Sequence, residues 1–280
     1  MFNNKLIKVI SFDATNTIFR VRISVGANYD SVLRRYGVYV DKELVNKHFI
    51  KSFSLHSKQS PCYGNSNDNI NNNTNVKKYA SGLDWWSDLI KILIEKSSNL
   101  NRNQIDQIPK QAFHDLYHQY GVKGANQIEG KGRHEFWELY PEVHDTLQYL
   151  KDKGYILSMI SNFDDRLQDL LKNLNVLHYF NHSNSNNSKN NLITTSIDVG
   201  AQKPNPKIFD YHLKQLQSID PSIVSNQVVY IGDSIDKDAK ASLEFGFQSC
   251  LLDRENKLNQ SDIPNNCKLI HSLNDLKSYY

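Results

Sequence analysis

The chain has 280 residues, of which 39% are hydrophobic and 11% aromatic, so it can bury a core and is not wholly disordered. Its formal net charge of +3 comes from 33 basic and 30 acidic residues without a basic stripe, which excludes the usual pattern of nucleic-acid binding. No segment approaches the ~18 apolar residues of a membrane span, and the N-terminus lacks a signal-peptide pattern. Cys62, Cys250 and Cys267 are too dispersed for a disulfide framework or zinc site. We therefore expect a soluble cytoplasmic protein, with the nucleus left open, and no nucleic-acid or membrane partner.

Short apolar runs of strand length recur along the chain, and most are followed by turn residues and then a helical pattern. Four runs and one shorter candidate fit this description: 6–12, 155–160, 228–231, 249–252 and 268–270. Strands that alternate with helices predict an α/β fold with a doubly wound, mainly parallel sheet.

The region from about Arg22 to Arg133 has a different pattern, with no clear strand and helical stretches at 29–36, 84–96 and 104–120. Its apolar residues recur at helical spacing, and its aromatic stripe is interpreted as core packing. The spacing predicts an all-helical domain at residues 22–135, inserted into a sheet domain formed by 1–21 and 136–280.

Two asparagine-rich tracts interrupt these patterns. Residues 64–76 contain seven asparagines and residues 181–191 contain six. Such polar runs bury too little apolar surface to offset the entropy of ordering, so both are predicted to be disordered insertions.

Polar side chains follow two of the predicted strands directly. Asp13 ends the first run, and Ser161 and Asn162 end the second. Ligand sites of open α/β sheets lie at the carboxyl ends of strands, where a hydroxyl and backbone N–H groups can hold an anion. Taken singly, each residue is better explained as a turn residue or a helix cap.

Two further segments carry charge. Lys203 precedes a proline-stiffened stretch that starts a helix, and a fixed ammonium there can neutralise a carboxylate or phosphate. The apolar run 228–231 leads into Gly232, Asp233, Asp236 and Asp238, and oxygen ligands at a strand end suit Mg²⁺. A carboxylate, a hydroxyl, a lysine and an acidic cluster thus follow one another in this order. Four unrelated caps and turns explain such an order poorly.

This ordered set resembles the four motifs of haloacid dehalogenase-like hydrolases. The segment GDSIDKDAKASLEFG resembles the fourth motif over its full length. The segments ISNFDDRL, KPNPKIF and GLDWW resemble a narrower helical-cap subgroup, that of the third haloacid dehalogenase-like hydrolase domain-containing protein and the rhythmically expressed insect proteins. The resemblance implies a Rossmann-like core and a helical cap after the first motif.

The resemblance also implies roles for individual residues. Asp13 would attack phosphorus and form an aspartyl-phosphate. Asp13 and Asp233, with the Thr15 carbonyl, would bind Mg²⁺, and Asp238 would position these ligands. The substrate would be a small phosphorylated metabolite.

The phosphoryl group would be held by a second set of residues. Ser161 and the Asn162 backbone would bind its oxygens, and Lys203 would offset the negative charge of the nucleophile and the phosphate. Thr17 would bind substrate or stabilise the first loop.

The sequence departs from the family pattern at Thr15, where phosphatases of this kind usually carry a second Asp, and at Asn16, where they carry Gly. Threonine cannot act as a general acid or base near pH 7, and such help is typically worth ~10²–10⁴-fold. Histidines of the inserted domain, His56, His114 and His134, are candidates to replace it.

Three interpretations remain open at this point. The chain is a slow or narrow phosphatase, a metal-independent dehalogenase, whose first loop also lacks the second Asp, or a non-catalytic protein that binds a phosphorylated ligand or a partner. The Gly232-Asp233 pair favours the metal-dependent phosphatase.

Overall fold

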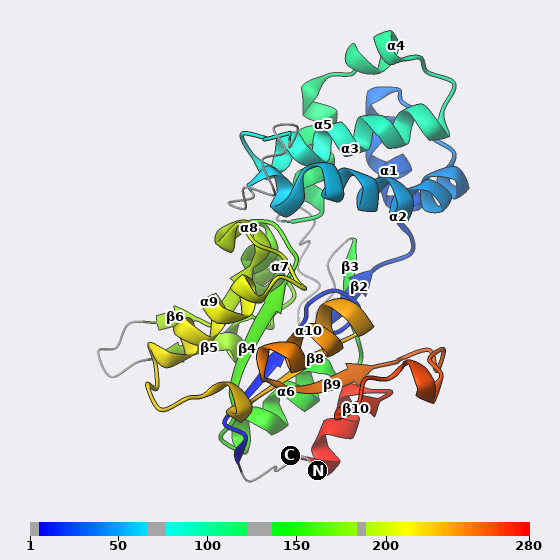
Figure 1. The fold of residues 1–280 in the computed structure, drawn as a ribbon. Coiled ribbons are helices and arrows are strands. Elements are labelled where there is room, and N and C mark those ends of the chain that lie inside the picture. Colours follow the sequence, from blue (N-terminus) through cyan, green and yellow to red (C-terminus); the bar gives the residue numbers. More distant parts are fainter. Residues whose placement is uncertain (1–5, 66–76, 122–135, 184–188) are drawn as a thin grey trace. The chain divides into compact units, whose positions relative to one another are not determined.

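The computed structural model describes residues 6–65, 77–121, 136–183 and 189–280 (Figure 1). The chain forms two compact units. The core unit comprises Met1–Arg20, Leu139–Asn162 and Leu174–Tyr280, and the helical unit comprises Val21–Glu138 and Phe163–Asn173. The sequence-based division had assigned 163–173 to the sheet domain, whereas in the structure this segment groups with the helices.

The core unit is built on a six-stranded sheet in the order β10-β9-β8-β1-β4-β7, in which all neighbouring strands are parallel. Its strands are β1 (Val9–Phe12), β4 (Ile156–Ser161), β7 (Ile193–Thr195), β8 (Val228–Gly232), β9 (Gln248–Leu252) and β10 (Cys267–Ile270). The chain order runs outward from β1 in both directions, so the order of strands reverses beside β1.

The predicted fold class is therefore confirmed, and each of the five expected apolar runs overlaps a strand of this sheet. The first run was predicted to begin at Leu6, but β1 begins only at Val9. The sixth strand, β7, was not predicted. It has three residues and follows the second asparagine-rich tract, so it is too short to show a pattern of alternation or an apolar run.

Helices flank the sheet. They are α6 (Val143–Asp152), α8 (Ser196–Val199), α9 (Pro206–Gln217) and α10 (Ala241–Phe245). Asn205 caps α9 by accepting a hydrogen bond from the Lys207 N–H, and Pro206 stands at its first position, where no backbone donor is needed. The apolar face of α9, with Phe209 and Leu216, packs with Val9 of β1 and Val228 of β8 in one buried cluster. This packing holds the strands whose ends carry the polar segments.

The helical unit contains α1 (Val25–Leu33), α2 (Lys42–Gln59), α3 (Gly82–Ser97), α4 (Arg102–Asp106), α5 (Lys110–Gln119) and α7 (Leu167–Asn173). The predicted stretch 104–120 is two helices: α4 ends at Asp106, and Pro109, which has no N–H to continue a helix, stands at the N-cap of α5. The 18-residue helix α2 was not predicted, since its polar and apolar residues are mixed along the sequence. Trp85 is fully buried, as the packing interpretation of the aromatic stripe requires.

Two small sheets complete the fold. Strands β2 (Phe19–Val21) and β3 (Trp137–Leu139) pair where the chain passes between the units. Strands β5 (Asn181–Ser183) and β6 (Lys189–Asn191) pair antiparallel, so the ends of the second asparagine-rich tract are ordered, contrary to the prediction. Two strands pair through backbone hydrogen bonds and need no apolar side chains for that, so a polar composition does not exclude strand pairing. Residues 66–76 of the first tract and 184–188 lie outside the described residues.

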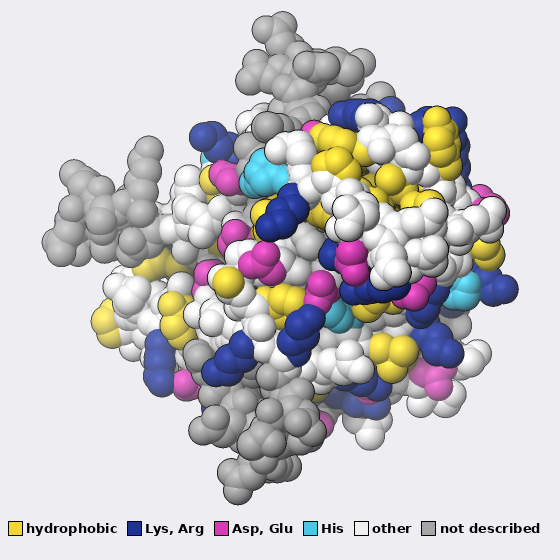
Figure 2. Space-filling view, turned by 90° about the horizontal axis from the view of Figure 1, so that it is seen from above, with side chains coloured by type: hydrophobic (Ala, Val, Ile, Leu, Met, Phe, Trp, Pro, Cys, Tyr) yellow, Lys and Arg dark blue, Asp and Glu magenta, His cyan; other side chains and the backbone are white. Residues whose placement is uncertain are grey.

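Over the face drawn in Figure 2, Lys and Arg side chains lie interspersed with Asp and Glu, and no continuous basic stripe crosses it. This mixture agrees with the nearly balanced composition. Among the described residues, no helix combines the length and the apolarity that a bilayer crossing requires.

Candidate active site

Three neighbouring strands deliver the predicted polar residues to one edge of the sheet. Asp13 follows β1, Ser161 ends β4 on one side of it, and Asp233 follows β8 on the other. The backbone N–H of Asp13 donates to the Ile231 carbonyl at 2.8 Å, which extends the pairing of β1 with β8. Because the strand order reverses at β1, this edge is the place where open α/β sheets bind ligands.

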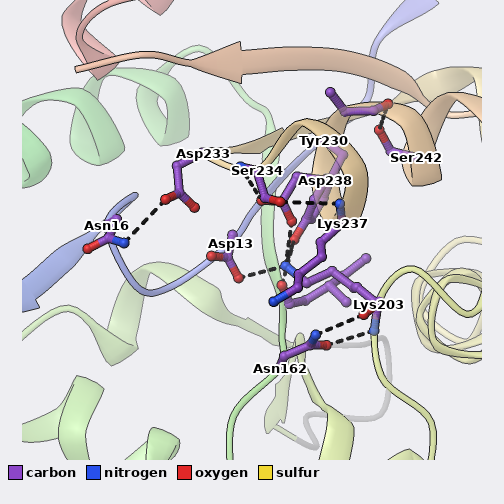
Figure 3. Close-up of polar contacts among 12 residues, drawn as sticks. Asp13, Asn16, Asn162, Lys203, Tyr230, Asp233, Ser234, Lys237, Asp238 and Ser242 are labelled. Atoms are coloured by element: carbon purple, nitrogen blue, oxygen red, sulfur yellow. Dashed lines mark hydrogen bonds and ion pairs between the residues drawn. The ribbon is translucent and has the colours of Figure 1, made fainter. Parts of the chain in front are cut away.

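Lys203 joins this cluster from a distant part of the chain (Figure 3). Its ammonium is 2% exposed and donates to Asp13 Oδ1 at 2.7 Å, Asp238 Oδ1 at 2.6 Å and the Tyr230 hydroxyl at 2.7 Å. Three acceptors use all three N–H donors of a lysine. The ammonium is therefore fixed beside the Asp13 carboxylate.

Asn162 holds the backbone that carries Lys203. Its side-chain oxygen accepts from the Lys203 N–H at 2.7 Å, and its amide nitrogen donates to the Lys203 carbonyl at 3.0 Å (Figure 3). The sequence-based prediction used only the backbone of Asn162, as a phosphate donor. The structure shows that its side chain ties the end of β4 to the lysine segment.

Tyr230 is a site residue that sequence reasoning missed. It is fully buried in β8, and its hydroxyl accepts from Lys203 and donates to the Ile160 carbonyl at 2.7 Å. The signal was a single tyrosine in an otherwise aliphatic strand, because a buried phenol needs a hydrogen-bond partner.

The acidic segment after β8 is shaped by a close approach. A Cβ on Gly232 would lie 2.4 Å from the Asp238 carboxyl group, so no larger residue fits there. The Ser234 N–H donates to Asp238 Oδ2 at 2.9 Å, and Asp238 Oδ1 accepts from Lys203. Asp238 is 2% exposed and anchors the lysine.

Asp233 has a different environment from Asp238. The Asn16 side chain donates to its Oδ2 at 3.2 Å, and Lys203 does not bond to it (Figure 3). Asn16 adopts a φ of 60°, a left-handed conformation that asparagine tolerates better than most residues. The left-handed position of the turn is thus occupied by asparagine, whose side chain adds a contact to Asp233.

The charges of the cluster do not balance. Carboxylate oxygens of Asp13, Asp233 and Asp238 lie within 4.8 Å of one another, and Lys203 is the cation bonded to two of them. Burial, with the neighbouring carboxylates, raises the pKa of Asp233 to about 7. Burial also raises the pKa of Asp13 although Lys203 opposes the shift. Burial opposes protonation of Lys203, but the Asp13 and Asp238 carboxylates raise its pKa above the ordinary value.

These residues fit a divalent cation. An oxygen-only set with excess negative charge at a strand end is what Mg²⁺ prefers, and two positive charges would offset the repulsion that raises the pKa of Asp233. Asp13 and Asp233 are the carboxylates suited to hold it, because Asp238 is already engaged by Lys203 and the Ser234 N–H.

The remaining predicted residues lie on the same edge. Ser161 is buried at the end of β4, and Thr15 is half-buried in the turn after Asp13. The Thr17 hydroxyl is fully buried and makes no hydrogen bond within the described residues, so its expected contribution to the loop is not a side-chain bond. Its carbonyl is bonded instead, to Arg254 at 2.8 Å.

The histidines proposed as substitutes for an acid belong to the helical unit. His56 is buried, and its Nε2 lies 3.1 Å from the Trp85 carbonyl, with its pKa lowered by burial. The contact with Trp85 gives His56 a structural role inside the helical unit. His114 Nδ1 lies 3.3 Å from Gln111 Nε2 on α5, and His134 lies outside the described residues.

A sequence profile described as hydrolase, haloacid dehalogenase-like hydrolase, matches residues 7–246. The match spans Asp13, Ser161, Lys203, Asp233 and Asp238. The chain belongs to the haloacid dehalogenase-like hydrolase family.

Individual proteins of this family agree with the match. The chain is 23% identical to haloacid dehalogenase-like hydrolase domain-containing protein 3 of Bos taurus, over 88% of this chain and 82% of the bovine one. It is 25% identical to the rhythmically expressed gene 2 protein of Drosophila melanogaster, over the same shares of the two chains. The resemblance to this subgroup is thereby confirmed.

Solved structures of the family share the fold. A haloacid dehalogenase-like phosphatase from Thermococcus onnurineus has a TM-score of 0.56 and 20% identity, over 98% of this chain and 97% of that one. A 2-haloacid dehalogenase from Pseudomonas syringae has a TM-score of 0.59 and 17% identity, over 97% of each chain. A hydrolase of the family from Bacillus subtilis, bound to magnesium, has a TM-score of 0.60 and 15% identity, over 98% of each chain. At these identities the likeness shows a shared fold and no more.

Proposed function

We propose that this haloacid dehalogenase-like hydrolase is a Mg²⁺-dependent phosphatase that acts on a small phosphorylated metabolite through Asp13. One observation carries the proposal: the Asp13 and Asp233 carboxylates lie together at the ends of β1 and β8 with more negative charge than Lys203 offsets. A dehalogenase that needs no metal gains nothing from Asp233. The magnesium-bound relative from Bacillus subtilis supports the same cofactor.

The chemistry assigned to the chain has two steps. A carboxylate oxygen of Asp13 forms a bond to phosphorus while the bond from phosphorus to the ester oxygen breaks, and the leaving oxygen takes a proton from solvent. Water then attacks the phosphorus of the aspartyl-phosphate, loses a proton and releases inorganic phosphate, which restores Asp13.

Fixed charges make the first step feasible. Lys203 lies 2.7 Å from Asp13 and lowers the repulsion between the carboxylate and an incoming phosphate. The Ser161 hydroxyl and the Asn162 N–H are the proposed donors to the phosphoryl oxygens. Mg²⁺, held by Asp13, Asp233 and the Thr15 carbonyl, would supply positive charge to the phosphoryl group as it transfers.

Thr15 sets the expected rate. A threonine hydroxyl neither gives nor takes a proton near pH 7, so turnover should be ~10²–10⁴-fold below that of a phosphatase with Asp at this position. Substrates with good leaving groups, such as aryl or acyl phosphates, should be least affected because their leaving oxygen needs little help.

The same residue favours a second candidate function. A site that binds phosphate but turns over slowly suits a protein that binds a phosphorylated ligand as a regulator. Fold and family do not decide between the two, since function depends on the site. In that case Asp13→Asn should leave binding and cellular function intact.

The test is a screen of phosphorylated metabolites and p-nitrophenyl phosphate, with Mg²⁺ and with EDTA, using wild type and Asp13→Asn. We expect phosphate release that requires Mg²⁺ and Asp13. The matched control is Asp210→Asn on α9, because Asp210 forms an exposed ion pair with Lys214. This variant should keep wild-type rates.

Each other outcome points to a different function. Halide release from a 2-haloacid in the presence of EDTA would establish the dehalogenase. Ligand binding without release of phosphate, retained in Asp13→Asn, would establish the binding protein.

A further inference from the structure

Arg254, two residues after the end of β9, makes an unusual set of contacts for a residue outside every motif. Its Nε donates to the Asn16 carbonyl at 3.2 Å, and its Nη2 donates to the Thr17 carbonyl at 2.8 Å. Its Nη1 donates to Glu142 Oε1 at 2.6 Å. The guanidinium carbon lies 3.5 Å from the centroid of the Tyr140 ring. The side chain is 15% exposed, so these contacts hold it in one place.

The two carbonyls belong to the turn that follows Asp13. Within this turn the Ile18 N–H donates to the Ala14 carbonyl at 2.8 Å, and the Asn16 N–H donates to the Phe19 carbonyl at 2.7 Å. The turn's own bonds thus use other acceptors than the Asn16 and Thr17 carbonyls. Arg254 supplies their donor, and Asn16 is the residue with the left-handed φ of 60°.

The same turn carries two groups of the proposed metal site. The Thr15 carbonyl belongs to the peptide before Asn16, whose N–H donates to the Phe19 carbonyl, so a turn held by Arg254 also holds the direction of the Thr15 carbonyl. The Asn16 side chain donates to Asp233 (Figure 3). A displaced turn would therefore disturb the two groups together.

Arg254 is itself anchored from a third segment. Glu142, 10% exposed and just before α6, accepts from Arg254 and also from the Leu273 N–H at 3.4 Å. A bond between two ionised groups of low exposure is stronger than a neutral one. The anchor connects the turn, the start of α6 and the loop after β9, which are far apart in the sequence.

We infer that Arg254, held by Glu142 and Tyr140, is a positioning residue that fixes the turn after Asp13 for metal binding. The inference rests on the proposed function, because it needs Mg²⁺ at Asp13 and Asp233. Arg254 also lines a cavity of about 270 Å³ with Asn16, Asp233 and Tyr140. A direct contact of Arg254 with substrate is thus the competing explanation, and the test must separate the two.

The test is a titration of the purified, substrate-free chain with Mn²⁺. Electron paramagnetic resonance measures the concentration of free Mn²⁺ and so gives the Kd. Groups that orient metal ligands typically change affinity ~10–100-fold when removed. We expect Arg254→Met to raise the Kd for Mn²⁺ by ~10–100-fold. Arg254→Lys should restore part of the affinity, because an ammonium can still donate to the turn carbonyls although it lacks the planar fork of a guanidinium. Lys257→Met is the matched control, since it removes a positive charge from the same loop at a side chain paired with Glu255.

Three results would overturn the inference. The first is a folded Arg254→Met protein whose Kd for Mn²⁺ stays within about twofold of wild type, whether the variant loses thermal stability or raises only the KM for substrate. The second is an equal loss of affinity in Lys257→Met. The third is a wild-type chain that binds no Mn²⁺ at all, which would overturn the proposed function as well. A wild type that binds Mn²⁺ but releases no phosphate would overturn the proposed function alone.

Discussion

Each of the two units buries a cationic side chain against carboxylates, Lys203 in the core unit and Arg166 in the helical unit. Lys203 faces Asp13 and Asp238, and a third carboxylate, Asp233, lies within 4.8 Å of them. Burial and repulsion raise the pKa of Asp233 to about 7. The core cluster is therefore one in which the folded chain holds more negative charge than it compensates.

The cluster in the helical unit is balanced. Arg166 donates to both oxygens of Asp164, from Nε at 2.9 Å and from Nη2 at 2.5 Å, and its Nη1 donates to the Tyr117 carbonyl at 2.8 Å. The Trp86 indole donates to Asp164 at 2.7 Å, and the guanidinium carbon lies 3.9 Å from the Tyr117 ring centroid. One cation meets one anion, and these contacts explain why 163–173 groups with the helices.

The difference is the one expected between a structural ion pair and the proposed metal site. A balanced pair with its donors and acceptors satisfied needs nothing further. An excess of buried carboxylates is unfavourable without a cation, and it persists where it serves a function. Substitutions in the two clusters should therefore have opposite effects on activity and on stability.

The largest effect is expected from Asp13→Asn. Loss of the nucleophile should lower kcat for any phosphate ester by at least ~10³-fold, as loss of a covalent nucleophile does in other hydrolases. The melting temperature should change little, because the substitution also removes one of the repelling charges. Turnover and thermal unfolding of the same preparation check both parts. A large loss of stability with retained turnover would make the core cluster structural.

Arg166→Met should have the opposite profile. It leaves the buried Asp164 without its cation, which typically costs ~3–5 kcal/mol of unfolding free energy. Urea denaturation followed by tryptophan fluorescence measures the loss, since Trp86 lies in the cluster. Lys214→Met, which breaks an exposed pair with Asp210, is the control and should cost less than ~1 kcal/mol. Equal losses in the two variants would contradict the proposed difference between buried and exposed pairs.

Thr15→Asp should increase turnover. A carboxyl group at this position can protonate the leaving oxygen and then activate water, which is worth ~10²-fold or more. The gain should be greater for alkyl than for aryl phosphates, because aryl leaving groups need less help. Comparison of kcat for the two classes in wild type and variant checks this prediction. No gain with either class, in a variant that still requires Mg²⁺, would show that Thr15 does not limit the rate.

The smallest expected effect is the release of a proton from Asp233 when Mg²⁺ binds. The ordinary pKa of the Asp233 carboxyl is 3.8, and in the metal-free fold it is about 7. The folded chain therefore holds a proton that the unfolded chain has lost, and this group makes stability fall as the pH rises from about 4 to about 7. Mg²⁺ binding at pH 6 should release about one proton. Calorimetry in two buffers of different ionisation enthalpy measures the release, and Asp233→Asn should abolish it.

Much of this arrangement was predictable from local sequence. The runs that overlap β1, β4, β8, β9 and β10 are apolar enough to indicate strands, and candidate site residues stand at the ends of three of them. Asp13, Ser161 and Asp233 could be placed together because parallel strands end at one edge of a sheet. Strand β7 escaped prediction because three residues carry too little pattern, and Pro109 divided a helix predicted as one.

The sequence by itself thus determined the fold class and the residues around Asp13. Only the tertiary structure decided that Tyr230 holds Lys203, that Arg254 holds the turn after Asp13, and that Arg166 ties its segment to the helices. The physical reason is the range of the interactions. Strand and helix patterns repeat over a few residues and are visible locally, whereas these three contacts join segments 27, 237 and 49 residues apart, whose meeting depends on how the whole chain packs.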